Sequence, residues 1–428
     1  MTDQDIARLG PAFASFLRRF YPCFLRKRTA AHCDNYCRGL LSDLPRKSVE
    51  PIALACGTAV RTPQEFLTTA TWDHELARGM LQRHMAEVIQ ALPADPLGTV
   101  GVIDETSCFK QGDKTPCVRR QYLGCLGKID NGIVTVHIGV ARGRFQALLD
   151  ADLYLPRSWD QDRQRCREAG IPDEVRYRAK WRIALDQLLR LHKNGVRFDW
   201  LTFDEGYGGK VPFLTVLSLA GQKFVAEVPV SFAVQTGGPS RTCRADTLLT
   251  SEAARAGRRY RIRRLTQADA WWRASGLPVQ VRGHAYTLVA AVNEATAEVK
   301  YFVTNATGEP LARVLAVAFR RATVEHSFRV AKTEAGLTHY EGRQYVGLLR
   351  HLVLALIVMA FVSIHTDRLR GEKPAGDDGA GVPGAEHAVR DALSPPSGHG
   401  RIRSGRRGDS VSPAPQRAGG SFSQEAAA

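Results

Sequence analysis

Two short apolar segments are each followed directly by an acidic residue, and this repetition most constrains the fold. Residues 99–103 (TVGVI) precede Asp104, and residues 198–203 (FDWLTF) precede Asp204. Short runs rich in β-branched and aromatic residues predict buried strands. Ligands in open α/β sheets bind at the carboxyl ends of strands, so the two acids are candidates for one shared site.

The pattern between residues 97 and 228 predicts a mixed α/β unit. The dipeptide Asn131-Gly132 predicts a hairpin turn between two of its strands. The predicted segments are, in order, strands at 99–103, 121–127 and 133–140, an edge segment at 148–154, a helix at 178–191, a strand at 198–203, a helix at 212–219 and a strand at 224–228.

A helical pattern from Leu311 to Lys332 carries a third acid, Glu325. At about 100° per residue, steps of four and eleven residues place Arg321, Glu325 and Lys332 on one face of a single helix. A carboxylate between two cations suits a phosphate site, since the acid could bind a metal ion and the cations could bind the phosphate backbone that is cut. The alternative is a solvated helix with ordinary ion pairs.

The charge balance indicates a polyanionic partner. The chain has 59 Lys and Arg against 43 Asp and Glu, a formal charge of +16. Nucleic acid fits this excess best, and an anionic membrane surface is second but needs a basic amphipathic anchor, which the sequence lacks. The apolar run 352–364 is too short to span a bilayer and predicts a core helix. With no signal sequence, we expect a cytoplasmic protein.

The two ends of the chain differ in composition from this middle part. Residues 1–96 have a helical pattern with basic turns, which favours a DNA-binding region, although many helical bundles look the same. Residues 369–428 are rich in Gly, Pro, Ser, Arg and Ala and predict a disordered tail. The nine cysteines form no CxxC pair, so neither a disulfide framework nor a zinc module is expected.

Residues 229–310 predict a β-rich insertion. Within it, residues 258–264 (RRYRIRR) alternate arginines with other residues, so one strand face would suit a nucleic-acid backbone. Trp271 and Trp272 are either core residues or a surface that stacks on a base. The candidate DNA-binding residues are therefore Arg258, Arg259, Arg261, Arg263, Arg264, Trp271 and Trp272.

Three carboxylates at two strand ends and a helix predict a site for two divalent cations. Oxygen ligands suit Mg²⁺ or Mn²⁺, which activate the attacking oxygen and stabilise the leaving oxygen of a phosphoryl displacement. Asp104 would bridge the ions, with Asp204 and Glu325 completing one shell each. The alternative ligands are Glu105, Glu205 and Glu334.

These motifs resemble the DDE transposases of bacterial insertion sequences, which have a ribonuclease H-like catalytic domain. The signature Tyr-x2-Arg-x3-Glu-x6-Lys is matched by Arg321, Glu325 and Lys332, with Ala318 in place of the tyrosine. Asp104-Glu105-Thr106 resembles the first acidic motif of the family, and Asp204 with Gly206-Tyr207-Gly208 resembles the second. The similarity extends over roughly residues 15–365.

The resemblance implies a fold and an activity. The fold is an α/β, ribonuclease H-like mixed sheet with flanking helices and a β-rich insertion, after an all-helical N-terminal domain. Its parts would be 1–96 (DNA binding), 97–228 and 311–368 (catalysis), 229–310 (insertion) and 369–428 (tail).

The implied activity is metal-dependent cleavage at the terminal inverted repeats of a transposon, followed by strand transfer into target DNA. Arg321 and Lys332 would bind a DNA phosphate, and a homodimer or larger assembly would hold two DNA ends. The alternatives are a DNA-binding regulator or remnant without catalysis, and a ribonuclease H-like nuclease that cuts without joining.

Overall fold

The computed structural model describes residues 3–236, 241–262 and 269–371. The N-terminal part is helical, as its pattern predicts. Its elements are α1 (Asp3–Arg18), the short 3-10 helix η1 (Tyr21–Cys23), α2 (Lys27–Leu41), α3 (Val49–Ala55), α4 (Arg61–Thr68) and α5 (His74–Ala91). The predicted disordered tail falls mostly outside the described residues.

The described strands join into one mixed sheet. They are β1 (Val100–Phe109), β2 (Arg119–Leu123), β3 (Lys128–Arg142), β4 (Phe145–Leu153), β5 (Trp200–Phe203), β6 (Phe224–Val228), β7 (Ala233–Gln235), β8 (Thr242–Arg244), β9 (Arg258–Ile262), β10 (Ala270–Val281), β11 (His284–Asn293) and β12 (Val299–Thr304).

The order β4-β3-β1-β5-β6 forms the half of the sheet that carries the acids. β3 is antiparallel to both β1 and β4, whereas β5 is parallel to both β1 and β6. Ile103 of β1 is in register with Phe203 of β5. The residue after each of these two is an acid, so Asp104 within β1 and Asp204 directly after β5 lie at the same level of two neighbouring parallel strands.

Two sequence predictions about these strands are wrong. β1 continues beyond Asp104 to Phe109, so this acid lies within a strand and not at its end. The hairpin turn lies at residues 124–127, because Leu123 pairs with Lys128. Asn131 and Gly132 are inside β3, where a Cβ atom on Gly132 would be 2.4 Å from the carbonyl oxygen of Cys108. The glycine therefore permits close strand approach and forms no turn.

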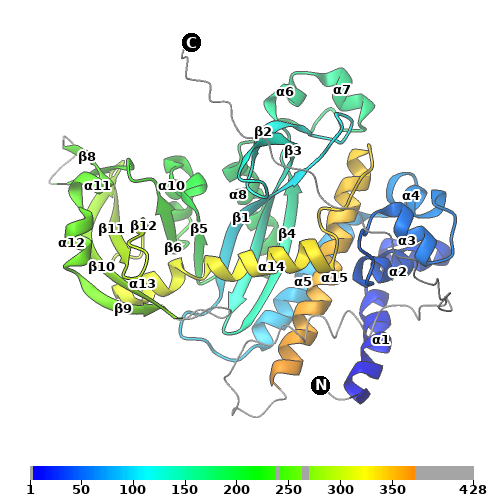
Figure 1. Ribbon diagram of the computed structural model, residues 1–428, viewed down its shortest axis with the longest axis horizontal. Coiled ribbons are helices and arrows are strands. Elements are labelled where there is room, and N and C mark those ends of the chain that lie inside the picture. The colour runs from blue at the N-terminus through cyan, green and yellow to red at the C-terminus, as the bar shows by residue number, and fades with distance from the viewer. Residues whose placement is uncertain (1–2, 237–240, 263–268, 372–428) are drawn as a thin grey trace, which may run out of the picture. The chain divides into compact units, whose positions relative to one another are not determined.

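The predicted β-rich insertion continues the same sheet. β12 pairs antiparallel with β6, and β11, β10, β9 and β7 follow outward. Figure 1 shows these strands (yellow-green) on the opposite side of β5 and β6 from β3 and β4. A side chain on β12 can therefore contact the acid-bearing half of the sheet.

Short helices connect these strands. They are α6 (Arg157–Asp160), α7 (Arg163–Glu168), α8 (Lys180–Lys193), α9 (Glu205–Gly208), α10 (Val211–Leu219), α11 (Ala245–Leu248) and α12 (Ser251–Arg255). Among them, α8 packs against β3 and β4.

The helix predicted from Leu311 to Lys332 is two helices, so this prediction is wrong. α13 (Leu311–Ala318) and α14 (Arg321–Glu334) are separated at Phe319 and Arg320. The Phe319 ring packs 4.6 Å from Trp272, and Arg320 Nη1 donates 2.9 Å to the carbonyl oxygen of Gly143. These tertiary contacts outweigh the uninterrupted helical pattern. α14 then lies across β1, β3 and β4 (Figure 1).

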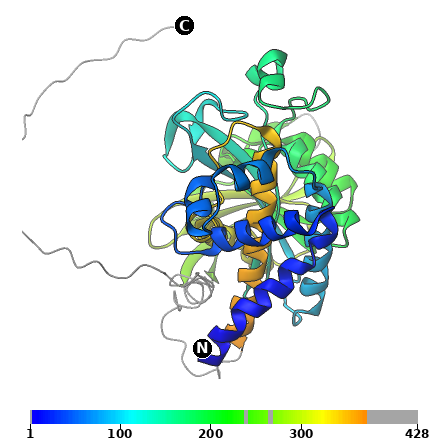
Figure 2. The ribbon, with the colours of Figure 1, turned by 90° about the vertical axis from the view of Figure 1, so that its right-hand side faces the viewer.

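α15 (Tyr345–Gly371) is the core helix predicted from its apolar run. By length and composition it could cross a membrane, but 89% of its most apolar window is buried within the protein. Phe361 packs 4.7 Å from Phe13 and 5.5 Å from Phe16 of α1. Figure 2 shows the blue N-terminal helices beside this orange helix. Burial of α15 thus joins the N-terminal helices to the sheet.

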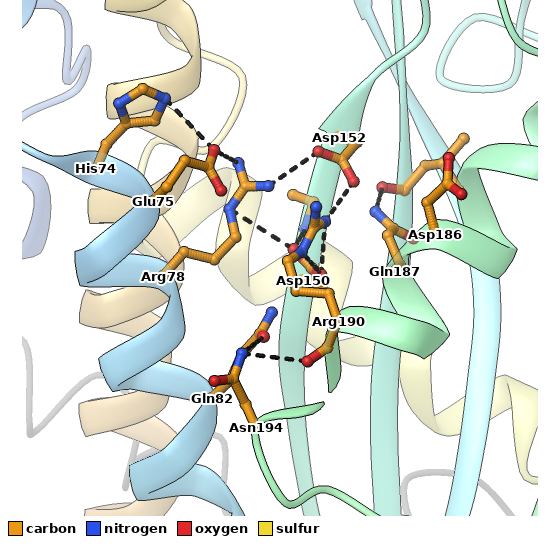
Figure 3. A network of polar contacts seen from close by, with 12 residues as sticks. His74, Glu75, Arg78, Gln82, Asp150, Asp152, Asp186, Gln187, Arg190 and Asn194 are labelled. Carbon is orange, nitrogen blue, oxygen red and sulfur yellow. Dashed lines mark hydrogen bonds and ion pairs between the residues drawn. The ribbon is translucent and has the colours of Figure 1, made fainter. Parts of the chain in front are cut away.

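A buried ion-pair network joins the same parts (Figure 3). Arg78 of α5 donates from Nη1 to Asp152 Oδ1 at 3.0 Å, and its Nε lies 3.9 Å from Asp150 Oδ1. Arg190 of α8 donates to Asp150 at 2.8 Å and to Asp152 at 2.5 Å. We call Arg78, Arg190, Asp150 and Asp152 the paired cluster. Within these four residues two cations face two anions, and the exposed Glu75 lies 3.4 Å from Arg78 at the edge of the cluster.

Candidate active site

Asp104 is held in a half-buried position on β1. Its Oδ1 accepts a hydrogen bond from the Glu105 backbone N–H at 2.7 Å. The pKa of Asp104 is raised to about 7, mainly by burial and also by the negative charges of Asp204 and Glu105, while Arg321 and the hydrogen bond from the Glu105 backbone oppose the rise. A carboxyl group that titrates near neutral pH in a polar site is typical of functional positions.

Asp204 caps the short helix α9, which follows β5. Its side chain accepts a hydrogen bond from the Tyr207 backbone N–H at 3.3 Å. The turn lies tightly against β6, because a Cβ atom on Gly208 would be 1.9 Å from the carbonyl oxygen of Glu227. Glycine at this position therefore lets the capped acid lie close to the end of β6.

Arg321, the first residue of α14, lies among these acids. Its Nη1 is 3.7 Å from Asp204 Oδ2, and its Nη2 is 3.5 Å from Glu227 Oε2. Burial lowers the pKa of Arg321, but Asp104, Glu227, Asp204 and Glu325 together raise it above its usual value. We call Asp104, Asp204, Glu227 and Arg321 the acidic site.

Glu227 is the member of the acidic site that sequence reasoning missed. It lies in the strand FVAEV, where it is half-buried. The signal available in the sequence was an acidic residue within an otherwise apolar segment. Its Oε1 accepts from Lys300 Nζ of β12 at 2.6 Å, while the same ammonium group lies 3.4 Å from Glu298. The insertion therefore supplies a cation that binds the acidic site through Glu227.

Tyr207 places an unpartnered hydroxyl group beside the acids. Its side chain is 3% exposed, and its hydroxyl oxygen has no hydrogen-bond partner in the described structure. Burial raises the pKa of Tyr207, and the charges of Glu105, Asp204 and Asp104 raise it further. A buried donor without a partner costs stability, so a bound ligand at this site would satisfy it.

Glu325 and Lys332 lie on α14, as predicted, but Glu325 forms no metal-binding group with two other acids among the described residues. Glu325 is exposed and acts on Arg321 through its charge. Lys332 is half-buried, 5.9 Å from the centre of the Phe328 ring. The pKa of His137 is lowered to about 3, mainly by burial and also by the charge of Lys332. The described residues contain no group of three His, Cys, Asp or Glu side chains that could hold a metal ion as they stand.

The alternative ligands have other surroundings. Glu105 Oε2 forms an ion pair with Lys180 Nζ at 2.6 Å, whereas Glu205 is exposed. Glu334 is buried at the end of α14, where its carbonyl oxygen accepts from Lys47 Nζ at 2.5 Å. Glu105 is therefore the one of these three whose charge acts on Asp104.

The candidate DNA-binding residues of the insertion separate into different environments. Trp272 is 1% exposed and belongs to the core, so its ring is closed to a base. Trp271 is 39% exposed, with the Arg259 guanidinium 4.0 Å from its ring centre. Arg259 pairs with Glu294 at 2.8 Å and Arg261 with Asp269 at 2.6 Å.

These ion pairs reduce the charge of the strand face predicted to be strongly positive, although Arg258 is exposed beside them. Arg263 and Arg264 lie outside the described residues.

Comparison with known proteins connects this geometry to a family. Residues 19–289 match the family described as DDE superfamily endonuclease, and the matched range includes Asp104 and Asp204 but ends before Glu325. A probable transposase for insertion sequence element IS701 from Microchaete diplosiphon is 36% identical over 194 residues. The match covers 44% of this chain and 46% of that relative, so it spans about half of each. The family match covers more than half of the chain, which therefore belongs to the DDE superfamily endonucleases.

Proposed function

We propose that this protein is an insertion-sequence transposase that cuts DNA at transposon ends and joins the freed end to target DNA. The observation that carries the proposal is the placement of Asp104 on β1 and of Asp204 directly after the adjacent parallel strand β5, with Arg321 beside them. The similarity to a probable transposase supports joining as well as cutting. We also propose that its partners are double-stranded DNA at the terminal repeats and the target, and a second protomer in the synaptic complex.

The strand order supports a ribonuclease H-like fold for the catalytic part. Three antiparallel strands are followed by two parallel ones, and the first strand is central in the order β4-β3-β1-β5-β6. α8 connects the antiparallel group to β5, and α10 connects β5 to β6. This arrangement places the carboxyl ends of the parallel strands at one edge, where α/β proteins bind ligands.

The oxygen donors of the acidic site fit Mg²⁺ or Mn²⁺. Asp104, Asp204 and Glu325 would hold two ions, which supply a stronger nucleophile and stabilise charge on the leaving oxygen. Since no three such groups converge in the described residues, the proposal requires Glu325 to approach the other two acids. Asp104 must be ionised to bind a metal, so deprotonation near pH 7 would precede loading.

The cations of α14 would bind DNA phosphates. Arg321 contacts Asp204 and Glu227, and a phosphate oxygen could replace these partners as metal ions neutralise the acids. Lys332 lies about three turns further along the same helix and would hold a neighbouring phosphate. Both residues orient the scissile bond, while the carboxylates act at the reacting oxygens.

Joining distinguishes a transposase from a nuclease. The experiment incubates labelled duplexes that carry the element's own ends with a supercoiled target plasmid and Mg²⁺ or Mn²⁺. The proposal expects cleavage followed by covalent joining, with both lost in Asp204→Ala and Glu325→Ala variants that still bind the ends. Cleavage without joined product would favour the nuclease. Binding without cleavage by the wild-type protein would favour the regulator or remnant.

A further inference from the structure

A cleft of about 700 Å³ lies away from the acids, between the N-terminal helices and the segments that follow β1 and α14. Its walls include Arg46, Lys110, Lys114, His339 and Arg343. We call this feature the basic cleft. Three segments far apart in the sequence line the cleft. Its basic residues therefore do not form a continuous run in the sequence.

The cations of the basic cleft are unequally neutralised. Arg46 forms an ion pair with Glu341, and Lys110 Nζ donates 2.5 Å to the carbonyl oxygen of Tyr340. Lys114 and Arg343 are exposed, and neither has an ion-pair partner among the described residues. Two cations are therefore available to a ligand, and the acids of the wall, Asp113 and Glu341, are fewer than the basic residues.

Neighbouring groups respond to a positive potential in the basic cleft. Burial lowers the pKa of His339, and the charges of Lys47, Arg46 and Lys110 lower it further. The pKa of Cys108 is raised by burial, and Lys110 and Lys332 both oppose that rise. The charge of Lys332 on α14 therefore acts on a residue of β1 next to the cleft wall.

Two elements connect the basic cleft with the acidic site. β1 runs from Asp104 to Phe109 at the wall of the cleft, five residues further, which corresponds to roughly 17 Å. Cys108 Sγ donates 3.0 Å to the carbonyl oxygen of Thr338, which follows α14 and also lines the cleft. A duplex rises 3.4 Å for each phosphate of one strand, so about 17 Å corresponds to roughly five base-pair steps.

We propose that the basic cleft, whose wall at Phe109 lies about five base-pair steps from the acidic site, binds the DNA backbone through Lys114 and Arg343. This inference rests on the proposed function for the position of the cut. DNA is the occupant that the observations favour, because a repeating anion satisfies cations on separate walls of an open cleft. The chain's charge of +16 agrees with a polyanionic partner.

The first test measures the salt dependence of end binding by a Lys114→Ala/Arg343→Ala double variant. Loss of two phosphate contacts should make the slope of log affinity against log salt about 1.8 less steep. Between about 50 and 200 mM salt, wild type should therefore lose about tenfold more affinity than the variant. Lys193→Ala, which removes an exposed cation from the end of α8, should leave the slope unchanged. Equal slopes for wild type and double variant would overturn the proposal.

The second test locates the contact relative to the cut. Two duplexes are prepared, one trimmed on each side of the scissile phosphate. Each keeps about three base pairs on its trimmed side, fewer than the roughly five base-pair steps predicted between the cut and the basic cleft. On the duplex that lacks the base pairs contacted by the basic cleft, the double variant should match wild type in affinity and cleavage. On the other duplex, the double variant should still bind and cleave less well than wild type. A defect that persists on both would place the lost contacts elsewhere and overturn the inference. Thermal unfolding verifies that the variant is folded.

These results separate the inference from the proposed function. If wild type cuts the ends but the double variant has a normal salt slope, the basic cleft is not a DNA site and the transposase assignment stands. If wild type binds with the predicted salt difference but does not cut with either metal, the cleft is a DNA site and the catalytic assignment fails.

Discussion

The paired cluster and the acidic site are both built from arginines and carboxylates, but they differ in charge balance. In the paired cluster, two arginines face two aspartates, and the Asp150 side chain is fully buried. In the acidic site, Arg321 lies among Asp104, Asp204 and Glu227, with Lys300 beyond Glu227. Carboxylates exceed cations there. Burial is the main cause that raises the pKa of Asp104 to about 7, and burial also raises the pKa of Asp150 in the paired cluster, where Arg190 and Arg78 oppose the rise.

The difference teaches how charge balance separates a structural group from a functional one. A balanced buried network holds elements in place, and breaking it leaves an uncompensated charge. An excess of carboxylates destabilises the folded protein by itself and is relieved when a cation binds. The same residue types therefore join α5 to the sheet in one region and, under the proposed function, would bind a metal ion in the other.

The largest expected effect breaks the balance of the paired cluster. Arg78→Met leaves Asp150 and Asp152 with Arg190 alone, so the free energy of unfolding should fall by about 3–5 kcal/mol. Urea unfolding measures it. The control is Glu75→Gln, since Glu75 is 53% exposed at 3.4 Å from Arg78 and should change stability by less than about 1 kcal/mol. Equal small losses in both variants would contradict a structural role for the cluster.

The second prediction concerns the pH dependence of stability at Asp104. The folded pKa lies above the ordinary value of 3.8, so the ionised carboxylate costs stability above pH 7. As the pH falls from about 7 to about 4, the folded protein takes up a proton and this cost disappears. Asp104→Asn lacks the charge, so it should be more stable than wild type by about 2 kcal/mol above pH 7, after allowance for partial exposure.

Stability is measured by thermal unfolding from pH 4 to 8. A constant difference between Asp104→Asn and wild type across this range would show that Asp104 does not titrate as proposed.

The third prediction tests the contact between the insertion and the acidic site. Glu227→Gln removes the charge that faces both Arg321 and Lys300, so Arg321 loses its orientation and DNA cleavage should fall by about tenfold. Glu298→Gln is a matched control, because Glu298 is an exposed acid 3.4 Å from the same lysine. Cleavage rates are compared at saturating metal. If both variants cleave like wild type, Glu227 has no part in the site.

The smallest effect is expected at Tyr207. Its buried hydroxyl has no partner in the described structure, so Tyr207→Phe should leave stability unchanged or raise it by about 1 kcal/mol. If the hydroxyl serves a bound ligand, metal affinity or cleavage falls in the same variant. Calorimetric titration with Mn²⁺ detects this. A clear loss of stability with normal metal affinity would instead make Tyr207 a structural residue.

The acidic site was partly predictable because two of its acids directly follow short apolar runs in the sequence. Asp104 and Asp204 stand after short apolar runs, a local signal, and their parallel register follows from the strand order. Glu227 had only a weak signal, since its role depends on Lys300, 73 residues later. The break between α13 and α14 had none, because distant contacts of Phe319 and Arg320 cause it.

The paired cluster was not predictable from the sequence. Its residues come from α5, β4 and α8, up to 112 positions apart in the chain, and each looks locally like an ordinary surface charge. The Asn131-Gly132 signal was misleading for a related reason. A glycine next to a polar residue favours a turn, but here the lack of a side chain serves close packing against β1.

The most direct test of the acidic site measures Mn²⁺- and Mg²⁺-dependent cleavage of a labelled transposon end by wild type and Asp104→Asn. Under the proposed function, this change removes a metal ligand and several kcal/mol of transition-state stabilisation, so cleavage should fall by at least about 10³-fold while the variant remains folded and binds the end. Cleavage by Asp104→Asn at a rate near that of wild type would contradict the account. The acids beside Arg321 would then not be the active site.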